Sequence, residues 1–285
     1  MVRYATKVKV DSKNPFIGHT HRPHVVEKLM GVTVRINSDG LRDREHLLIK
    51  GDRYRIIFLG DSITFGWGVE EKDSFKQILE TEINKQYPVE IINFGTGNYN
   101  TEQEVNFFLE KGLKYNPEKV VVFYFINDAE ITPKKSRSWF LHYSYAICFL
   151  RSRLNALMTD LISSQTFKEY YSNLYREDQE GWVRAKKAFV QLKSICDKKQ
   201  IRLQVILLPE MHDLHNYPFK KEHRLIANFL QENKIEFLDL APFFSAYKDS
   251  KQLWVAKDDP HPNKIGHRLI AEYSLDFISK RELLR

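Results

Sequence analysis

The stretch from Arg55 to Gly66, with the sequence RIIFLGDSITFG, constrains the fold of this chain more than any other. A short apolar run ends abruptly at Gly60-Asp61-Ser62, and a helical pattern follows soon after. This pattern is typical of a buried parallel strand that carries a serine hydroxyl to the carboxyl edge of a sheet. Ligands bind at that edge in open α/β sheets. Ser62 is therefore a candidate nucleophile, provided that the chain also supplies a base and an oxyanion site.

The rest of the chain alternates strand-like and helix-like segments. Further strands are predicted at 89–93, 120–126, 203–208 and 235–238, after a first one at 56–59. Helices with one apolar face are predicted at 75–83, 101–109, 185–196 and 265–277, where Thr101 and Glu104 form a capping-box pattern. This alternation predicts an α/β fold in which helices cover both faces of a parallel sheet.

The first 53 residues differ in pattern, and we interpret them as an N-terminal extension packed on a core domain of residues 54–285. The Asp39-Gly40 pair follows an alternating run and suits a tight hairpin. His19, His21 and His24 lie close together in sequence, which is one feature of a metal site. Because they flank Pro23 and no acidic residue lies at ligand spacing, we predict surface histidines and no metal site.

Residues 133–182 interrupt the alternation, since they are rich in aromatic side chains and contain no evident strand. We predict a helical insertion near the active edge of the sheet, where a lid or a substrate wall would lie. The alternative is that these aromatic residues only form the packing core of the insertion.

Composition restricts the location and the partners of the chain. No apolar run is long enough to cross a bilayer, and the basic start lacks the apolar segment of a secretory signal, so we expect a cytoplasmic protein; peripheral membrane contact stays open. The net charge is +7, but 37 acidic residues are interspersed with the basic ones, which argues against a nucleic-acid partner. Cys148 and Cys196 have no metal-type spacing and are predicted to be buried free thiols.

The best candidate for the base is His261, in the sequence Asp258-Asp-Pro-His-Pro-Asn263 shortly before the last predicted helix. A serine hydroxyl is a poor nucleophile until a neighbouring base takes its proton. An aspartate close to that histidine accepts its other N–H and stabilises the imidazolium. Either Asp258 or Asp259 can fill this role, and we expect all of these residues to lie in a loop.

Acyl transfer also needs donors for the oxyanion that develops on the substrate carbonyl. Two segments at the ends of predicted strands can provide them. Asn93-Phe-Gly-Thr-Gly-Asn98 follows the second strand, and its glycines allow the backbone to approach a ligand. Asn127 follows the third strand, and its side-chain amide can donate a hydrogen bond.

With these motifs in this order, the chain resembles the SGNH hydrolases, also called the GDSL esterase/lipase family. The resemblance implies that Ser62 is the nucleophile and that its own backbone N–H is one oxyanion donor. It implies the Gly95 N–H and the Asn127 side chain as the other two. The last family block, usually Asp-x-x-His, falls on Asp258 and His261. The implied fold is a three-layer α/β/α sandwich with a parallel sheet of the flavodoxin-like type.

Two departures from the family pattern affect the site. Phe125 stands where a glycine is common two residues before the asparagine, and its bulk is expected to reshape the pocket. The acid is doubled, and we favour Asp258 over Asp259 because its spacing from the histidine is the usual one. His267 is predicted to be a helix residue, and Asp61 to organise the serine turn.

The sequence thus predicts a serine esterase that needs no metal or cofactor and cleaves a carboxylic ester through an acyl-enzyme. Its substrate would be a small-molecule ester or the ester of a lipid or carbohydrate. Two alternatives remain open. One is an acyltransferase that uses the same residues with a sugar or lipid hydroxyl in place of water. The other is a non-catalytic module that binds carbohydrate or lipid.

Overall fold

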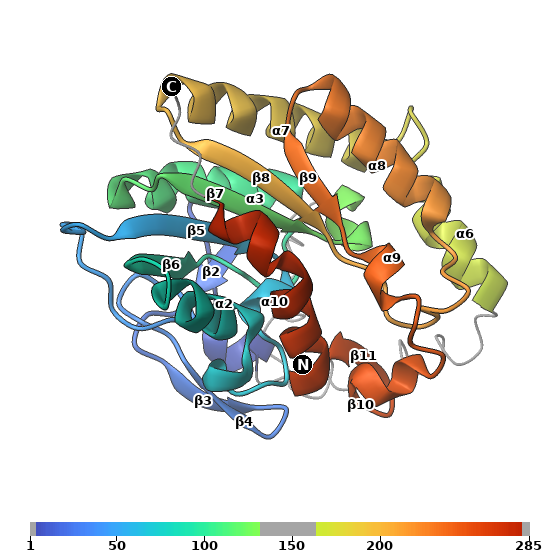
Figure 1. The fold of residues 1–285 in the computed structure, drawn as a ribbon, viewed down its shortest axis with the longest axis horizontal. Helices are drawn as coiled ribbons and strands as arrows, with labels where there is room; N and C mark the ends of the chain where they lie inside the picture. Colours follow the sequence, from blue (N-terminus) through green and yellow to red (C-terminus); the bar gives the residue numbers. More distant parts are fainter. Residues whose placement is uncertain (1–3, 132–163, 281–285) are drawn as a thin grey trace.

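Five parallel strands form the central sheet of the computed structural model, which describes residues 4–131 and 164–280 (Figure 1). In spatial order the strands are β6 (Val89–Asn93), β5 (Tyr54–Gly60), β7 (Lys119–Tyr124), β8 (Arg202–Leu207) and β9 (Glu236–Asp239). Every neighbouring pair is parallel. Numbered along the chain, this order is the 2-1-3-4-5 order of flavodoxin-like folds. The predicted α/β fold is confirmed.

The strands are apolar throughout because both faces of the sheet are buried. Successive side chains of β5 point to opposite faces: Ile57 and Leu59 pack in one core, whereas Ile56 and Phe58 pack in the other. This two-sided burial explains why the run before Ser62 has no alternation of polar and apolar residues.

Helices cover both faces of the sheet and complete three layers (Figure 1). One face is covered by α2 (Phe75–Asn84) and α10 (Lys264–Ser279), and the other by α3 (Thr101–Phe107), α7 (Glu180–Lys198) and α8 (Lys220–Glu232). The other α-helices of the described residues are α1 (Ser62–Phe65), α6 (Ser164–Leu174) and α9 (Ala241–Phe244).

The start of α3 differs from the prediction. The residue that caps this helix is Asn100, whose side chain accepts the N–H of Gln103, while the Gln103 side chain accepts the N–H of Asn100. The capping box predicted from Thr101 and Glu104 is therefore shifted by one residue. Asparagine competes well with threonine for the capping position. As a consequence, Glu104 does not cap the helix and lies fully inside the protein.

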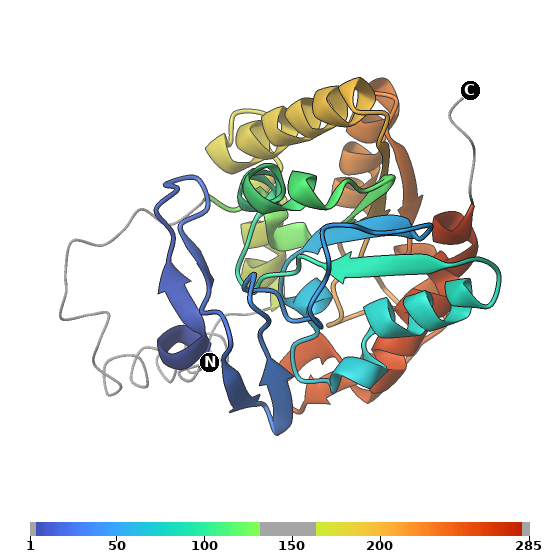
Figure 2. The ribbon, with the colours of Figure 1, turned by 90° about the vertical axis from the view of Figure 1, so that its left-hand side faces the viewer.

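Before the sheet, the chain forms two antiparallel strand pairs, which lie to one side of the sheet in Figure 2. They are β1 (Lys9–Asp11) with β2 (His19–His21), and β3 (Val26–Leu29) with β4 (Val32–Arg35). Apolar residues of this region share a small core with Phe65 and Trp67, which follow β5. The N-terminal segment therefore packs directly on the turn that contains Ser62.

Two expectations for this segment are wrong. Residues 37–40 form a turn closed by the Gly40 N–H on the Asn37 carbonyl, but they do not join paired strands. His21 is 2% exposed and is not a surface residue. Its ring contacts the Tyr4 hydroxyl at 2.8 Å, and burial lowers the pKa of this histidine to about 3. His21 is therefore neutral and part of the packing.

Most of the predicted insertion at 133–182 lies outside the described residues, as does Cys148; the described remainder contains α6 and the beginning of α7. Cys196 is a buried free thiol on α7. Within the described ranges, no helix combines the length and the apolar character that crossing a membrane requires.

Candidate active site

Ser62 is the first residue of α1 and lies directly beyond the carboxyl end of β5. Asp61 caps this helix, since its side chain accepts the N–H of Ile63 at 2.8 Å. The turn before the helix is tight: a Cβ on Gly60 would lie 2.1 Å from the Thr64 hydroxyl oxygen. Only glycine fits there, and the prediction that Asp61 organises the serine turn agrees with this geometry.

His261 reaches Ser62 from the opposite end of the sequence. It lies on β11 (Asp259–Pro262), which pairs with β10 (Trp254–Ala256) in a short antiparallel hairpin rather than in the predicted loop. The Ser62 Oγ and the His261 Nε2 are 2.8 Å apart. At this distance a serine hydroxyl donates a hydrogen bond to an imidazole nitrogen, which is the arrangement that a general base needs.

The carboxylate that contacts His261 is that of Asp259 and not that of Asp258, which we favoured from the sequence. His261 Nδ1 and Asp259 Oδ1 are 2.5 Å apart. Asp258 is exposed in the turn of the hairpin, because the pairing of Ala256 with Asp259 leaves only 257 and 258 to make the turn. The register of the hairpin thus selects the second aspartate.

Asp259 is fixed by a second donor that the sequence analysis did not find. The indole Nε1 of Trp67 donates a hydrogen bond to its Oδ2 at 3.0 Å. Burial opposes ionisation of this carboxyl, but the hydrogen bonds from His261 and Trp67 outweigh it and keep the pKa of Asp259 below its ordinary value. Asp259 is therefore a carboxylate at neutral pH, and its negative charge faces the His261 ring. No local pattern around Trp67 indicated this contact.

Asn127 lies on the same edge of the sheet, in a short 3₁₀ turn, Ile126–Ala129, that follows β7. Its Nδ2 donates to Asp61 Oδ2 over a long distance of 3.4 Å. Its Oδ1 is buried and has no partner among the described residues. The amide is thus close to the serine turn and only weakly engaged. Phe125, two residues before it, packs against both apolar cores.

Gly95 also lies next to the serine turn, but its N–H is engaged. It donates to the Asn93 side-chain Oδ1 at 2.9 Å. A Cβ on Gly95 would lie 2.3 Å from the Phe65 nitrogen, so the absence of a side chain allows the two segments to touch. The close approach that we predicted for this glycine is made to the protein's own backbone.

Behind the serine turn lie two buried carboxyls that the sequence analysis did not single out as functional. Both Glu104 oxygens and Asp128 Oδ1 have no hydrogen-bond partner in the described part of the chain. Burial raises the pKa of each well above its ordinary value. Repulsion by Asp61 adds to the effect on both, and repulsion by Glu104 adds to it on Asp128. In the described ranges, no group of three histidine, cysteine or acidic side chains could hold a metal ion.

Known proteins similar to this chain share its fold. Residues 58–269 match the sequence profile of a protein family described as "GDSL-like Lipase/Acylhydrolase family". An acetyl xylan esterase, AlAXEase, is 18% identical with a TM-score of 0.50, and the match covers 79% of this chain and 99% of that one. TesA is 9% identical with a TM-score of 0.52, over 79% and 97% of the two chains. A two-domain esterase active on acetylated mannans is 14% identical with a TM-score of 0.51, over 82% and 52%. No curated protein sequence gives a significant match.

Proposed function

This chain belongs to the GDSL-like lipase/acylhydrolase family of hydrolases, and we propose that it cleaves carboxylic esters with Ser62 as nucleophile and His261 as general base. The observation that carries the proposal is the 2.8 Å contact between Ser62 Oγ and His261 Nε2, two residues 199 positions apart in sequence. The contact of His261 with Asp259 supports it, because it completes a Ser-His-Asp arrangement.

In this mechanism, His261 Nε2 takes the proton of Ser62 as the Oγ attacks the ester carbonyl carbon. Asp259 holds the imidazole with its Nδ1–H directed away from the serine and stabilises the imidazolium. The imidazolium then protonates the leaving alcohol, which departs from the acyl-enzyme. A water molecule, deprotonated by His261, attacks the acyl carbon, and the return of the proton to Ser62 releases the acid.

The oxyanion would accept hydrogen bonds from the Ser62 N–H and from Asn127 Nδ2. As the first residue of α1, Ser62 has an N–H without a partner inside the helix. The Asn127 amide has only a long hydrogen bond to exchange for the substrate oxygen. The Gly95 N–H would become the third donor only after it breaks its hydrogen bond to the Asn93 side chain.

The similar structures suggest which substrates to test first. Two of them are named as esterases of acetylated xylan or acetylated mannan. We therefore propose acetyl esters, including those on carbohydrates, ahead of lipid esters. An acyltransferase would use the same residues and differ only in the acceptor, so products formed with added sugar or lipid hydroxyls separate the two reactions.

The test of this function is hydrolysis of p-nitrophenyl esters from acetate to palmitate by the wild type and by Ser62→Ala. We expect turnover of the short esters and a fall of about a thousandfold or more in kcat for the variant. The profile over chain length measures the depth of the acyl pocket. A Ser62→Ala variant with undiminished turnover would remove the serine from the mechanism.

The two adjacent aspartates provide a matched pair of variants. Asp259→Asn should lower kcat by roughly a thousandfold or more, because the asparagine amide favours the wrong tautomer of His261. Asp258→Asn removes the same charge one residue earlier and should leave kcat unchanged within about twofold, since an acid can orient the imidazole only by contacting it. The reverse ranking would assign the acid to Asp258, as the family spacing suggested.

A further inference from the structure

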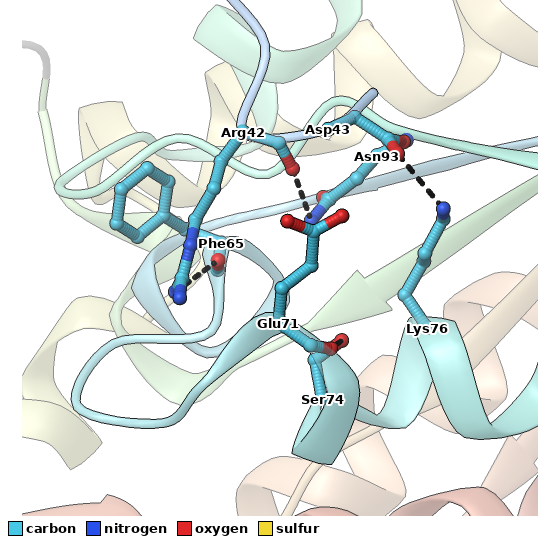
Figure 3. Close-up of a pocket in the computed structure, with 7 residues that line it drawn as sticks. All are labelled: Arg42, Asp43, Phe65, Glu71, Ser74, Lys76 and Asn93. Carbon is cyan, nitrogen blue, oxygen red and sulfur yellow. Dashed lines mark hydrogen bonds and ion pairs between the residues drawn. The ribbon is translucent and has the colours of Figure 1, made fainter. Parts of the chain in front are cut away.

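A buried arginine from the N-terminal segment contacts the end of the helix that begins at Ser62 (Figure 3). Arg42 is 3% exposed. Its Nη1 donates to the carbonyl oxygens of Phe65, at 3.1 Å, and of Gly66. Its Nη2 donates to the carbonyl of Val69 at 2.6 Å. One guanidinium thus binds three backbone carbonyls that follow the candidate nucleophile.

These contacts matter because α1 is only four residues long. A single helical turn is unstable alone, and its last carbonyls have no partner within it. A cation at this end also complements the partial negative charge of the helix. The planar guanidinium offers several donors in a fixed arrangement, which a lysine ammonium does not. The position of α1, and with it the position of Ser62 at its start, therefore depends on the hydrogen bonds from Arg42.

The next residue, Asp43, holds the second motif of the site. Its Oδ2 accepts the backbone N–H of Asn93 at 2.8 Å, and its Oδ1 accepts from Lys76 Nζ at 2.9 Å. Asn93 in turn accepts the N–H of Gly95. Figure 3 shows Asp43 between Lys76 and Asn93, with Arg42 directed toward Phe65. Two adjacent residues therefore hold both the serine turn and the turn after β6.

The space around these contacts is small. A cavity of about 10 Å³ is lined by Arg42, Asp43 and their neighbours. That is about the volume needed for one water molecule, so with the guanidinium in place there is no room for bulk solvent beside these contacts. Since a Cβ on Gly95 would touch the backbone of Phe65, a shift of either turn is transmitted to the other.

We propose that Arg42 and Asp43 are positioning residues that fix the serine turn against the Asn93–Gly95 turn and so set the alignment of Ser62 with His261. This inference rests on the proposed function of Ser62. It assigns to the N-terminal segment a part in catalysis, although neither residue touches the reacting atoms. A misplacement of about 1 Å is enough to slow a reaction by about a hundredfold.

The test compares Arg42→Lys and Arg42→Ala with Arg35→Lys as the matched control. Arg35 belongs to the same N-terminal segment but is exposed on β4. For both Arg42 variants we expect kcat on p-nitrophenyl acetate to fall about tenfold or more, with KM within about threefold, because orientation and not binding is lost. Labelling of Ser62 by a fluorophosphonate should slow in parallel, and millimolar guanidinium, but not sodium chloride, should partly restore Arg42→Ala.

The outcomes separate the two proposals. If wild-type Ser62 is neither labelled by the fluorophosphonate nor active on esters, the proposed function fails, and the positioning role fails with it. If the wild type reacts and folded Arg42→Lys keeps kcat and labelling rate within about twofold, only the positioning role is overturned, since a misplaced nucleophile would lose more than that. If Arg42→Ala does not fold, Arg42→Lys decides the question. Because the fluorophosphonate labels only folded protein, the final extent of labelling gives the folded fraction of each sample.

Discussion

The protein accommodates buried carboxyl groups in two ways, and the difference separates anchoring from the candidate active site. In the first region, which we call the paired cluster, acidic and basic side chains bind one another: Asp43, Glu80 and Glu90 with Arg44, Arg55 and Lys76. In the second region, the unpaired carboxyls Glu104 and Asp128 lie behind the serine turn, and no ion pair is formed by either one within residues 4–131 and 164–280.

The two regions respond to pH with opposite signs. Burial alone would raise the pKa of Asp43, but Lys76 and His46 outweigh it and lower the pKa well below the ordinary value. This carboxyl stabilises the fold above its unfolded pKa near 3.8, and that contribution is lost as the pH falls through the folded pKa. Burial raises the pKa of Glu104, so its contribution is present at low pH and is lost as the pH rises.

This contrast indicates what each region is for. Paired charges fix the N-terminal segment on β6 and α2, at the place from which Arg42 and Asp43 hold the two turns of the site. Unpaired buried carboxyls cost stability, and such groups gather at functional sites. Repulsion by Asp61 adds to the raised pKa of both groups, so these carboxyls belong to the surroundings of the candidate nucleophile and not to the anchoring region.

The largest effect should come from breaking the paired cluster with Lys76→Met. Lys76 binds Asp43 at 2.9 Å and Glu80 at 3.0 Å, and all three side chains are at most 5% exposed. Because, among the described residues, Asp43 would keep only His46 and Glu80 only Arg44 as ion-pair partners, we expect the free energy of unfolding to fall by about 3 kcal/mol. Urea denaturation at pH 7 measures it.

Lys85→Met is the control for this prediction. Lys85 pairs with Glu82 at the carboxyl end of α2, the helix that carries Lys76 at its start, but the two side chains are 64% and 40% exposed. Its loss should change the free energy of unfolding by no more than about 1 kcal/mol. Equal effects of the two variants would show that the paired cluster is not an anchor.

The strands of the sheet could be predicted because most of them are short runs rich in apolar residues that are buried on both faces. β6 was predicted with the bounds that the structure gives, Val89–Asn93. β7 ends at Tyr124, two residues earlier than predicted, because Ile126 starts the 3₁₀ turn that carries Asn127. Apolar side chains continue across that boundary, so the sequence pattern does not mark it.

From the sequence, only those parts of the candidate site that lie at strand ends or in short motifs could be predicted. Ser62 and His261 each lie in a local pattern with chemical meaning, and for that reason the sequence alone makes them candidates for the site. The choice between Asp258 and Asp259 depends on the register of a hairpin with strands of three and four residues, too short for a periodic signal. Arg42 has partners 23 to 27 positions away, and no local pattern connects them.

A smaller effect, on activity alone, is expected from Asn127→Ala beside the unpaired carboxyls. If its amide stabilises the oxyanion, kcat should fall by roughly a hundredfold or more. The one hydrogen bond that its side chain makes to the described residues is 3.4 Å long, so the thermal midpoint should hardly change. Steady-state kinetics with thermal unfolding of the same sample measure both. Near-normal kcat would exclude Asn127 from the mechanism and leave the oxyanion with fewer donors.

The last and sharpest test of the comparison is a slope of stability against pH. Glu104→Gln replaces a carboxyl that burial keeps protonated with a neutral side chain of the same shape. In the wild type the native state binds more protons at Glu104 than the unfolded state above pH 4.5, so stability falls as the pH rises, by at most about 1.4 kcal/mol per pH unit for one proton. The variant lacks this dependence. Its thermal midpoint should therefore match the wild type at pH 5 and exceed it progressively toward pH 8. A constant difference across this range would mean that Glu104 is charged in the native state, and the contrast between the two regions would then be one of hydrogen bonding and not of ionisation.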